Sequence, residues 1–595
     1  MSSDHSAPGS ERAVLDANIE RIEALTRRLV AALASQRRKP PTLEGPGQEL
    51  YLKAAAAYFA EMMANPSKML EQQVSYWGES LRNFAKAQES VLSGDHAAHE
   101  EPSADRRFQD AMWTANPYFN FIKQQYLMSS DAIGRAVEGL EELDDKDRAR
   151  IRFFSRQIVD LMSPTNFLAS NPEALQRALE TNGQSLVSGL ENLVHDIEAN
   201  DGALAVTLAD PDAFEVGGNI ATTRGAVVFQ NRMFQLIQYA PRTERVHRIP
   251  LIIFPPWINK FYILDLKPEN SLIRWAVGQG HTVFVVSWVN PDATYADVGI
   301  DTYMTEGFLT AINEVKAITQ EPKVNVVGYC IAGTMLSATL AYMARKGDKS
   351  VRAATFFTAL ADFTDPGETG VFLEEDFLGG IDQEVEKRGY LDAFYMQRTF
   401  SYLRANDLVY GPAIRSYMLG KPPPAFDLLF WNGDGTNLSG RLVREYLHHF
   451  CVGNELSEGR FTVLGERLNL RDITTPICAI ACETDHIAKW QGSFLGLNKT
   501  GGARTFILSE SGHIAGIVNP PSKNKYGHYT NVARMKSPES WKEGAEFHPG
   551  SWWPRWQGWL ARRSGAMIAA RTPGGPDHPV IEAAPGSYVR AKPGK

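Results

Sequence analysis

Six short apolar runs, separated by helix-compatible stretches, constrain the fold of the second half of this chain more than any other feature. They occupy residues 250–254, 282–287, 323–328, 352–357, 476–481 and 503–508. Continuous apolar strands of this length favour a parallel sheet that helices cover on both faces. The pattern therefore predicts a doubly wound α/β domain that follows the Gly217-Gly218 pair.

The fourth and fifth runs stand too far apart for a simple connection. More than a hundred residues separate Phe357 from Pro476, whereas a crossover between parallel strands needs about a dozen. This stretch is rich in aromatic residues and is broken by Gly and Pro. We expect it to be a helical cap insertion, at about 358–472, over the ends of the strands.

The remainder of the chain divides by composition. Residues 1–48 mix charge with Pro and Gly and predict a mobile N-terminal arm. Residues 49–205 carry helical patterns, among them an N-cap and a Pro at Asn171-Pro172, and predict a mostly α-helical N-terminal domain. The catalytic α/β domain is expected at 206–570, and a Pro/Gly-rich C-terminal tail at 571–595.

Charge and cysteine content limit the partners and the compartment. The chain has 61 Lys and Arg against 69 Asp and Glu, a net charge of −8, so it has no general basic field for a nucleic acid. No apolar run approaches the roughly 18 residues of a spanning helix. Four cysteines in 595 residues are too few for a disulfide framework and indicate a reducing, cytoplasmic setting, in which a special cysteine is expected to be catalytic.

One cysteine stands where a strand is expected to turn into a helix. Cys330 follows the run 323–328 and precedes a long helix-compatible stretch. This order matches the nucleophile elbow of α/β-hydrolases, G-x-S-x-G, with Gly328 two positions before the nucleophile and Ala332 two positions after it. Alone, the string fits a buried cysteine at the end of a core strand equally well.

Two later loops supply the expected partners of this cysteine. Asp485 follows the run 476–481, and His513 follows the run 503–508. The order nucleophile, acid, histidine is that of α/β-hydrolases. A histidine can take the thiol proton while a carboxylate orients its ring, so we predict a catalytic triad of Cys330, Asp485 and His513; the alternative is a surface aspartate and a loop histidine.

An oxyanion hole is expected from two backbone N–H groups. In this fold one belongs to the residue after the nucleophile, Ile331, and the other to a loop behind an earlier strand. Pro255 and Pro256 have no N–H to offer, which leaves Trp257 or Ile258 as the second donor. The two prolines could equally do no more than shape a turn.

Six motifs together resemble the polyhydroxyalkanoate synthases, and the chain length and tail resemble those of class I. The motifs are GYCIAGT, PPWINKFYILDL, SPTNFLASNPE, WNGDGTNL, TDHIAKW and SGHIAG. The resemblance extends from about Phe108 to the end of the chain. Two positions depart from the family pattern: Ala332 replaces a glycine of the G-x-C-x-G-G box, and residues 408–412 read LVYGP where LVWNY is common.

The resemblance implies an α/β-hydrolase fold and an acyltransferase. Such an enzyme polymerises (R)-3-hydroxyacyl-CoA, here expected to be short-chain 3-hydroxybutyryl-CoA, into a polyester and releases CoA. By motif, its nucleophile, aspartate and general base are Cys330, Asp485 and His513. Arg404 and His486 become candidates for contact with the substrate or CoA.

The same resemblance implies the partners of the chain. These are the acyl-CoA substrate, the growing polyester and its granule surface in the cytoplasm, granule-associated proteins, and a second copy in a homodimer. No cofactor or metal is expected beyond the CoA thioester, which is the substrate. Cys478 and Cys482 are interpreted as core residues, because nothing else completes a zinc site.

Two other functions remain open on the sequence. A thioesterase or polyester depolymerase would share the triad and let water reach the acyl-enzyme. A granule-surface protein would keep the fold without turnover.

Overall fold

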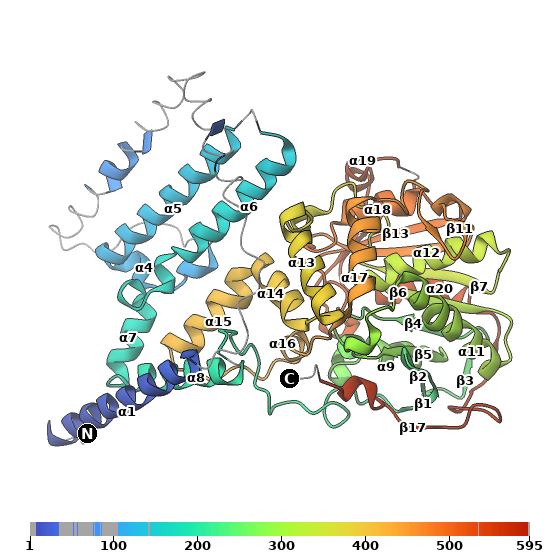
Figure 1. Ribbon diagram of the computed structural model, residues 1–595, viewed down its shortest axis with the longest axis horizontal. Helices are drawn as coiled ribbons and strands as arrows, with labels where there is room; N and C mark the ends of the chain where they lie inside the picture. The colour runs from blue at the N-terminus through green and yellow to red at the C-terminus, as the bar shows by residue number, and fades with distance from the viewer. Residues whose placement is uncertain are drawn as a thin grey trace. The chain divides into compact units, whose positions relative to one another are not determined.

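The computed structural model describes residues 8–34, a few helical positions between 52 and 85, and 105–592 apart from 141, 142, 201 and 534. It divides into two compact units (Figure 1). A helical unit comprises Met1–Asp210 and Thr399–Pro424, and an α/β unit comprises Pro211–Arg398 and Ala425–Lys595. None of the described helices is both long enough and apolar enough to cross a membrane.

An eleven-stranded sheet forms the centre of the α/β unit, within the part of the chain that the structure describes. Its strand order is β15-β14-β13-β12-β7-β6-β4-β5-β2-β1-β17, and the pairings from β13 to β5 are all parallel. These parallel strands are the six predicted runs: β4 (Leu251–Phe254), β5 (Val283–Trp288), β6 (Val324–Tyr329), β7 (Val351–Phe357), β12 (Ile477–Cys482) and β13 (Arg504–Ser509). The prediction of a parallel core is confirmed.

Both faces of the sheet are covered. Along β4, Leu251 and Ile253 belong to one buried cluster, whereas Ile252 and Phe254 belong to the other. Since successive side chains of a strand point to opposite faces, each face has its own core. This double burial explains why the strand is apolar at every position. The covering helices include α9 (Leu272–Gly278), α11 (Thr310–Thr319), α12 (Ile331–Arg345), α18 (Trp490–Asn498) and α20 (Trp553–Ala561).

Antiparallel strands extend the sheet at both edges, and the sequence did not predict them. They are β1 (Gly225–Gln230), β2 (Phe234–Tyr239), β14 (His528–Thr530), β15 (Glu546–His548) and β17 (Glu582–Ala583). β14, β15 and β17 are only two or three residues long, and β2 contains Gln235 and Gln238 although all of its residues are buried. Their apolar pattern is correspondingly weaker.

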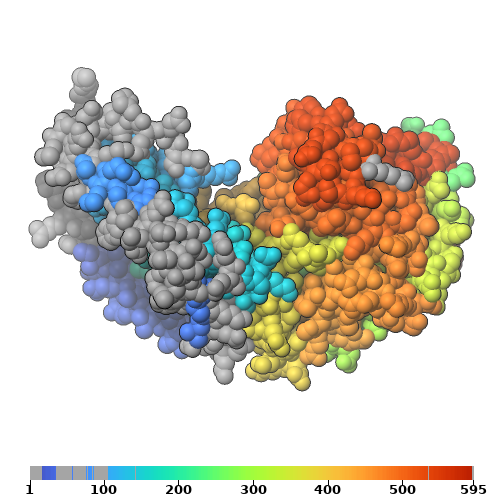
Figure 2. All heavy atoms as spheres, turned by 90° about the horizontal axis from the view of Figure 1, so that it is seen from above, coloured from blue at the N-terminus to red at the C-terminus, as the bar shows by residue number. Residues whose placement is uncertain are grey.

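The tail contributes the last of these strands. β17 pairs antiparallel with β1, and Ser587 donates its backbone N–H to Gln235 at 3.0 Å. The hydroxyl of Tyr588 donates to the carbonyl of Asn231 at 2.8 Å. Figure 2 shows orange and red C-terminal segments over much of the visible face of the α/β unit. The predicted Pro/Gly-rich tail is thus part of the folded sheet.

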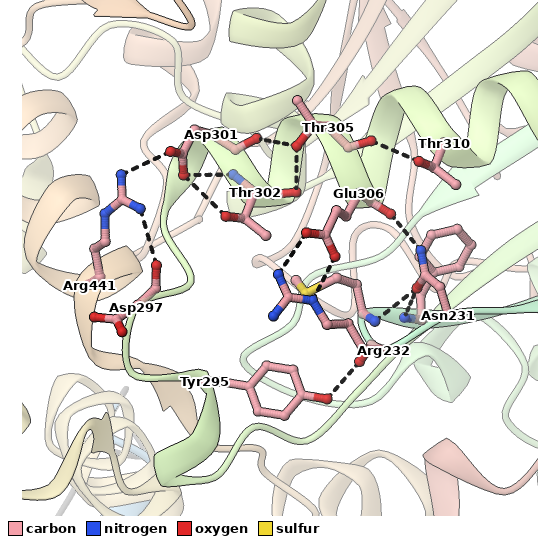
Figure 3. A network of polar contacts seen from close by, with 12 residues as sticks. Asn231, Arg232, Tyr295, Asp297, Asp301, Thr302, Thr305, Glu306, Thr310 and Arg441 are labelled. Atoms are coloured by element: carbon pink, nitrogen blue, oxygen red, sulfur yellow. Dashed lines mark hydrogen bonds and ion pairs between the residues drawn. The ribbon is translucent and has the colours of Figure 1, made fainter.

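A network of polar contacts connects a π-helical segment of the α/β unit to two other segments (Figure 3). α10 (Ile300–Thr302) and the π-helix η7 (Tyr303–Leu309) lie at its centre. Arg232, in the turn between β1 and β2, makes a two-pronged ion pair with Glu306 at 2.7 and 2.6 Å. Arg441, from the helix α17 (Gly440–Glu445) of the insertion, pairs with Asp301 at 3.0 Å. These exposed pairs align the segments but add little stability.

The described part of the helical unit is mostly helical. Its longer members are α1 (Pro8–Ala34), α5 (Pro117–Glu138), α6 (Asp145–Leu161), α7 (Pro172–Glu180) and α8 (Gln184–Ala199). As the sequence predicts, the side chain of Asn171 caps α7, where it accepts from the N–H of Ala174 at 3.0 Å. Gly183, with φ of 79°, separates α7 from α8.

Residues 8–34, which the sequence places in a mobile arm, form the helix α1. Leu25 on this helix is buried with Val187 and Val194 of α8. The charged stretch thus retains enough apolar positions at helical spacing to pack on a neighbour. The rest of the predicted arm, 35–48, and most of 49–104 lie outside the described residues.

Part of the predicted cap insertion belongs to the helical unit instead. Within Thr399–Pro424, the Tyr417 hydroxyl donates to the Asp196 carboxylate at 2.6 Å. α8 approaches this segment so closely that a Cβ on Gly189 would stand 1.9 Å from the Tyr417 carbonyl oxygen. Within the span 358–472, the two flanking pieces remain with the α/β unit.

Candidate active site

Cys330 occupies a sharp turn between β6 and α12. Its backbone has φ of 54° and ψ of −125°, an unfavourable conformation for a residue with a side chain. β6 ends at Tyr329 and α12 begins at Ile331, so a single residue makes the turn. This is the geometry expected of a nucleophile elbow.

The small residues around the turn have distinct roles. A Cβ on Gly328 would lie 2.7 Å from the Cα of Gly333, and one on Gly333 would lie 2.3 Å from the Cβ of Ala359. Ala332 is fully buried and is accommodated with its methyl group. The close approach therefore requires Gly333 rather than a glycine at 332, and the departure from the family box leaves the turn intact.

Asp485 lies in the loop after β12 and is fixed from two sides. One carboxylate oxygen accepts the backbone N–H groups of Ile487 and Ala488, both at 2.8 Å. The other oxygen stands 2.7 Å from Nδ1 of His513. The Asp485 side chain is 0% exposed, so this carboxylate has a single orientation, toward the imidazole.

His513 lies between Asp485 and Cys330. Burial by itself lowers the pKa of His513, but the Asp485 carboxylate and Cys330 outweigh it and raise this pKa from 6.5 to about 10. With Nδ1 on Asp485, the other ring nitrogen is the one available to the sulfur. The structure thus brings the three predicted residues together, and their surroundings favour a charged imidazole.

Tyr329 supports His513 from the strand that carries the cysteine. The two rings stack with centroids 5.9 Å apart and an interplanar angle of 30°. The Tyr329 hydroxyl donates to the backbone carbonyl of His513 at 3.3 Å. This role of Tyr329 was not predicted, because its position just before the nucleophile reveals nothing about a residue 184 positions away.

Two adjacent tryptophans fix the loop that follows His513. The indole N–H of Trp552 donates to the carbonyl of Gly516 at 2.8 Å, and that of Trp553 donates to Ile517 at 2.9 Å. Both tryptophans are fully buried. These supports were not predicted, although a Trp-Trp pair at the start of a helix is an unusual string that could have drawn attention.

The predicted oxyanion donors lie next to the cysteine strand. β4 pairs directly with β6, so the loop after β4 emerges beside Cys330. Ile331 opens α12, where first-turn N–H groups have no acceptor within the helix. The carbonyls of Trp257 and Ile258 both accept from Thr436, at 2.5 and 3.0 Å. Ile331 and either Trp257 or Ile258 stay predictions as donors.

A turn of the insertion holds this loop. Asp434 pairs with the ammonium of Lys260 at 2.8 Å and accepts from the Tyr262 hydroxyl at 2.8 Å. The Trp431 indole donates to the Lys260 carbonyl at 2.7 Å. Burial lowers the pKa of Lys260, and the Asp434 carboxylate opposes this shift only in part. Trp431 lies in the short helix α16 (Asp427–Asn432), and the turn at 433–437 follows it; together they hold the loop after β4 in place.

Two candidates for contact with the substrate or CoA remain, together with two of the other cysteines. Arg404 belongs to the helical unit, where it pairs with Asp407 at 2.5 Å. His486 is half-buried in the loop beside Asp485. Both stay predictions for contact with the substrate or CoA. Cys478 and Cys482 are fully buried in β12, where burial raises the pKa of each thiol, so both are core residues as predicted.

Comparison with known proteins agrees with the fold. Residues 250–520 match the profile described as "alpha/beta hydrolase fold", which is the class that the sheet order and the elbow define. Residues 104–276 match the profile described as "Poly-beta-hydroxybutyrate polymerase (PhaC) N-terminus".

Three relatives have long, well-covered alignments with the chain. The Poly(3-hydroxyalkanoate) polymerase subunit PhaC of Rhizobium meliloti (strain 1021) is 42% identical over 90% of this chain and 90% of its own. The poly(3-hydroxyalkanoate) polymerase of Methylorubrum extorquens is 42% identical over 89% and 88%. The subunit PhaC of Cupriavidus necator (strain H16) is 42% identical over 86% and 87%. The chain belongs to the poly(3-hydroxyalkanoate) polymerase family.

Proposed function

We propose that this enzyme polymerises (R)-3-hydroxyacyl-CoA, with 3-hydroxybutyryl-CoA as the expected substrate, into a polyester and releases CoA. The observation that carries the proposal is Cys330 at the sharp turn after β6, with His513 and Asp485 aligned behind it. Membership of the polymerase family supports the choice of substrate.

Acylation begins with the Cys330 thiolate. The sulfur attacks the thioester carbonyl, and the developing oxyanion is held by the Ile331 N–H together with that of Trp257 or Ile258. The bond between the acyl carbon and the CoA sulfur breaks, and His513 returns the proton to the leaving CoA thiolate. One thioester replaces another, so the acyl group stays activated on the enzyme.

Elongation transfers this acyl group to a hydroxyl. His513 accepts the proton of an incoming 3-hydroxyl group, whose oxygen attacks the acyl carbon on Cys330. The C–S bond breaks, an ester C–O bond forms, and the thiolate is restored. Asp485 keeps the His513 ring in position and stabilises its charge. Ester formation from a thioester runs downhill, provided that water is kept from the acyl-enzyme.

The reaction as proposed uses only side chains and backbone donors of this chain. We therefore propose no resident cofactor or metal; the CoA thioester is consumed as substrate. The polyester product is insoluble in water, which supports a location at a cytoplasmic granule surface, and we expect a homodimer and contact with granule-associated proteins. Arg404 and His486 remain our candidates for contact with CoA.

Incubation of the purified full-length chain with 3-hydroxybutyryl-CoA tests the proposal. We expect CoA release together with recoverable polymer, and a loss of at least about a thousandfold in the Cys330→Ala variant. Cys451→Ala is the matched control and should retain activity, because burial raises the pKa of that thiol far from the reactive range.

The alternatives give different products. Release of free hydroxy acid without polymer would replace the proposal with a thioesterase or depolymerase. Absence of any turnover would favour a granule-surface protein. Full activity of Cys330→Ala would refute the assigned nucleophile whatever the product.

A further inference from the structure

A hollow with a volume of about 490 Å³ lies near the starts of the parallel strands, at the opposite end of these strands from Cys330. It is lined by Thr223, Arg224, Gly225, Ala240, Pro241, Arg242, Arg274 and Pro573. β2 runs antiparallel to β5, so its last residue, Tyr239, lies beside the start of the parallel strands. Cys330 follows the end of the parallel strand β6. The hollow and the candidate active site therefore lie at opposite ends of the parallel strands.

The lining is cationic. Arg224 and Arg242 are exposed, and Arg274 is half-buried. Among the described residues, none of these three side chains forms an ion pair, and no Asp or Glu lines the hollow. Three guanidinium groups on a concave surface create a positive local field, although the whole chain carries a net charge of −8. The buried Asp265 carboxylate offsets part of the charge of Arg274.

One buried carboxylate organises two walls of the hollow. Asp265, which is 1% exposed, accepts from the Thr223 hydroxyl at 2.5 Å and from the Ser271 hydroxyl at 2.6 Å. The Ser271 oxygen in turn accepts the backbone N–H of Arg274 at 2.8 Å. The segment before β1 and the first turn of α9 are thus fixed to the same group.

A buried amide fixes the third wall. Gln238 of β2 is 0% exposed; it donates to the carbonyl of Thr572 at 3.2 Å and accepts the N–H of Gly574 at 2.9 Å. These bonds hold Pro573 from both sides. The N–H of Ala240 donates to the carbonyl of Arg224 at 2.8 Å and closes the pair of strands beneath. In Figure 1, α9, β1 and β2 lie together in the lower part of the α/β unit.

We propose that this hollow binds a soluble phosphate ester of the nucleotide class, at a site separate from the one that holds Cys330. Guanidinium groups make two-pronged hydrogen bonds to phosphate oxygens. The prolines, Gly225 and Ala240 supply an apolar surface for a flat base. The volume falls within the range of about 300–1,000 Å³ that is usual for small-molecule sites.

Calorimetric titration of the full-length Cys330→Ala variant tests the proposal without turnover. The probes are ADP, pyrophosphate and adenosine. ADP is expected to bind saturably at one site, and adenosine at least about tenfold more weakly, because it lacks the charged groups. Pyrophosphate should bind more weakly than ADP and compete with it.

Variants of the exposed arginines locate the site. Arg224→Gln and Arg242→Gln should each weaken ADP binding about tenfold, a typical loss for one charge-assisted contact. Arg352→Gln removes the same charge from an exposed position at the start of β7. This position is at the same end of the parallel strands as the hollow but does not line it. The affinity of this variant for ADP should stay within about twofold of the parent.

Two results would overturn the proposal. One is the absence of saturable ADP binding. The other is an equal loss of affinity in Arg352→Gln and Arg242→Gln, which would indicate a general electrostatic attraction. Because the readout is binding to a protein without the nucleophile, either result leaves the proposed polymerisation untouched.

Discussion

The two halves of the candidate active site are held by different parts of the molecule. Cys330, Asp485 and His513 follow sheet strands, and strand neighbours or the tryptophans at the start of α20 fix their loops. The loop after β4, which should donate to the oxyanion, is held by the 433–437 turn of the insertion. We therefore expect proton transfer to depend on the sheet, and oxyanion stabilisation to depend on the insertion between β7 and β12.

In the half of the site that follows the sheet strands, Asp485→Asn should have the largest effect on activity. Loss of the carboxylate removes the orientation and charge support of His513, and comparable changes in a Ser-His-Asp triad lower kcat by about 10⁴. CoA release with 3-hydroxybutyryl-CoA measures the change. Asp365→Asn, an exposed acid paired with Lys489, is the control, and a similar loss there would remove the specific role assigned to Asp485.

In the half of the site that the insertion holds, Asp434→Ala should destabilise the protein. The Lys260 side chain is 5% exposed, and an ammonium group left buried without its partner costs about 3 kcal/mol or more of stability. Thermal unfolding measures the change. Asp407→Ala removes the exposed partner of Arg404 and should lower the free energy of unfolding by less than about 1 kcal/mol. Equal shifts would contradict the buried pair.

The stability difference between wild type and Asp485→Asn should depend on pH. The charged form of His513 is favoured when folding raises its pKa from 6.5 to about 10. Its contribution is complete below pH 6.5 and is lost as the pH rises through about 10. We expect the wild type to melt a few degrees above the variant at pH 6.5 and this gap to narrow by pH 10. A constant gap would show that His513 is neutral in the folded state.

Thr436→Val sharpens the comparison with the smallest effect. The variant keeps its shape but loses the hydroxyl bond to the Trp257 carbonyl, and the loop that should stabilise the oxyanion loosens. We expect kcat/KM to fall about tenfold, mostly through kcat. Thr305→Val, an exposed hydroxyl bonded to the Asp301 carbonyl, should leave both constants within twofold. A change confined to KM would assign the loop to substrate binding instead.

Local sequence patterns predicted the parts of the fold that are buried on both faces. The six parallel strands are apolar throughout, and the turn at Cys330 needs small neighbours, so both leave a local record. The edge strands do not, since β17 is two residues that pair with a strand made much earlier. The assignment of Thr399–Pro424 to the helical unit depends on contacts with α8, which no local pattern records.

The candidate site shows the same limit at the scale of side chains. The order of Cys330, Asp485 and His513 along the chain was sufficient to place them after the right strands. The supports were not predictable, because Tyr329 and Trp552 reach the histidine loop through tertiary contacts. The role of Asp434 was not predictable for a related reason. A Gly-Asp-Gly string indicates a turn, but it does not show that the aspartate will pair with Lys260.

The pairing of β17 with β1 has a consequence for how the protein is made. β1 leaves the ribosome long before β17 is synthesised, and its outer edge is open during that interval. Open edges invite pairing with other chains. Nascent molecules on one messenger RNA are therefore exposed to mutual association until translation passes Ala583, and a chain that stops before Glu582 carries that open edge permanently.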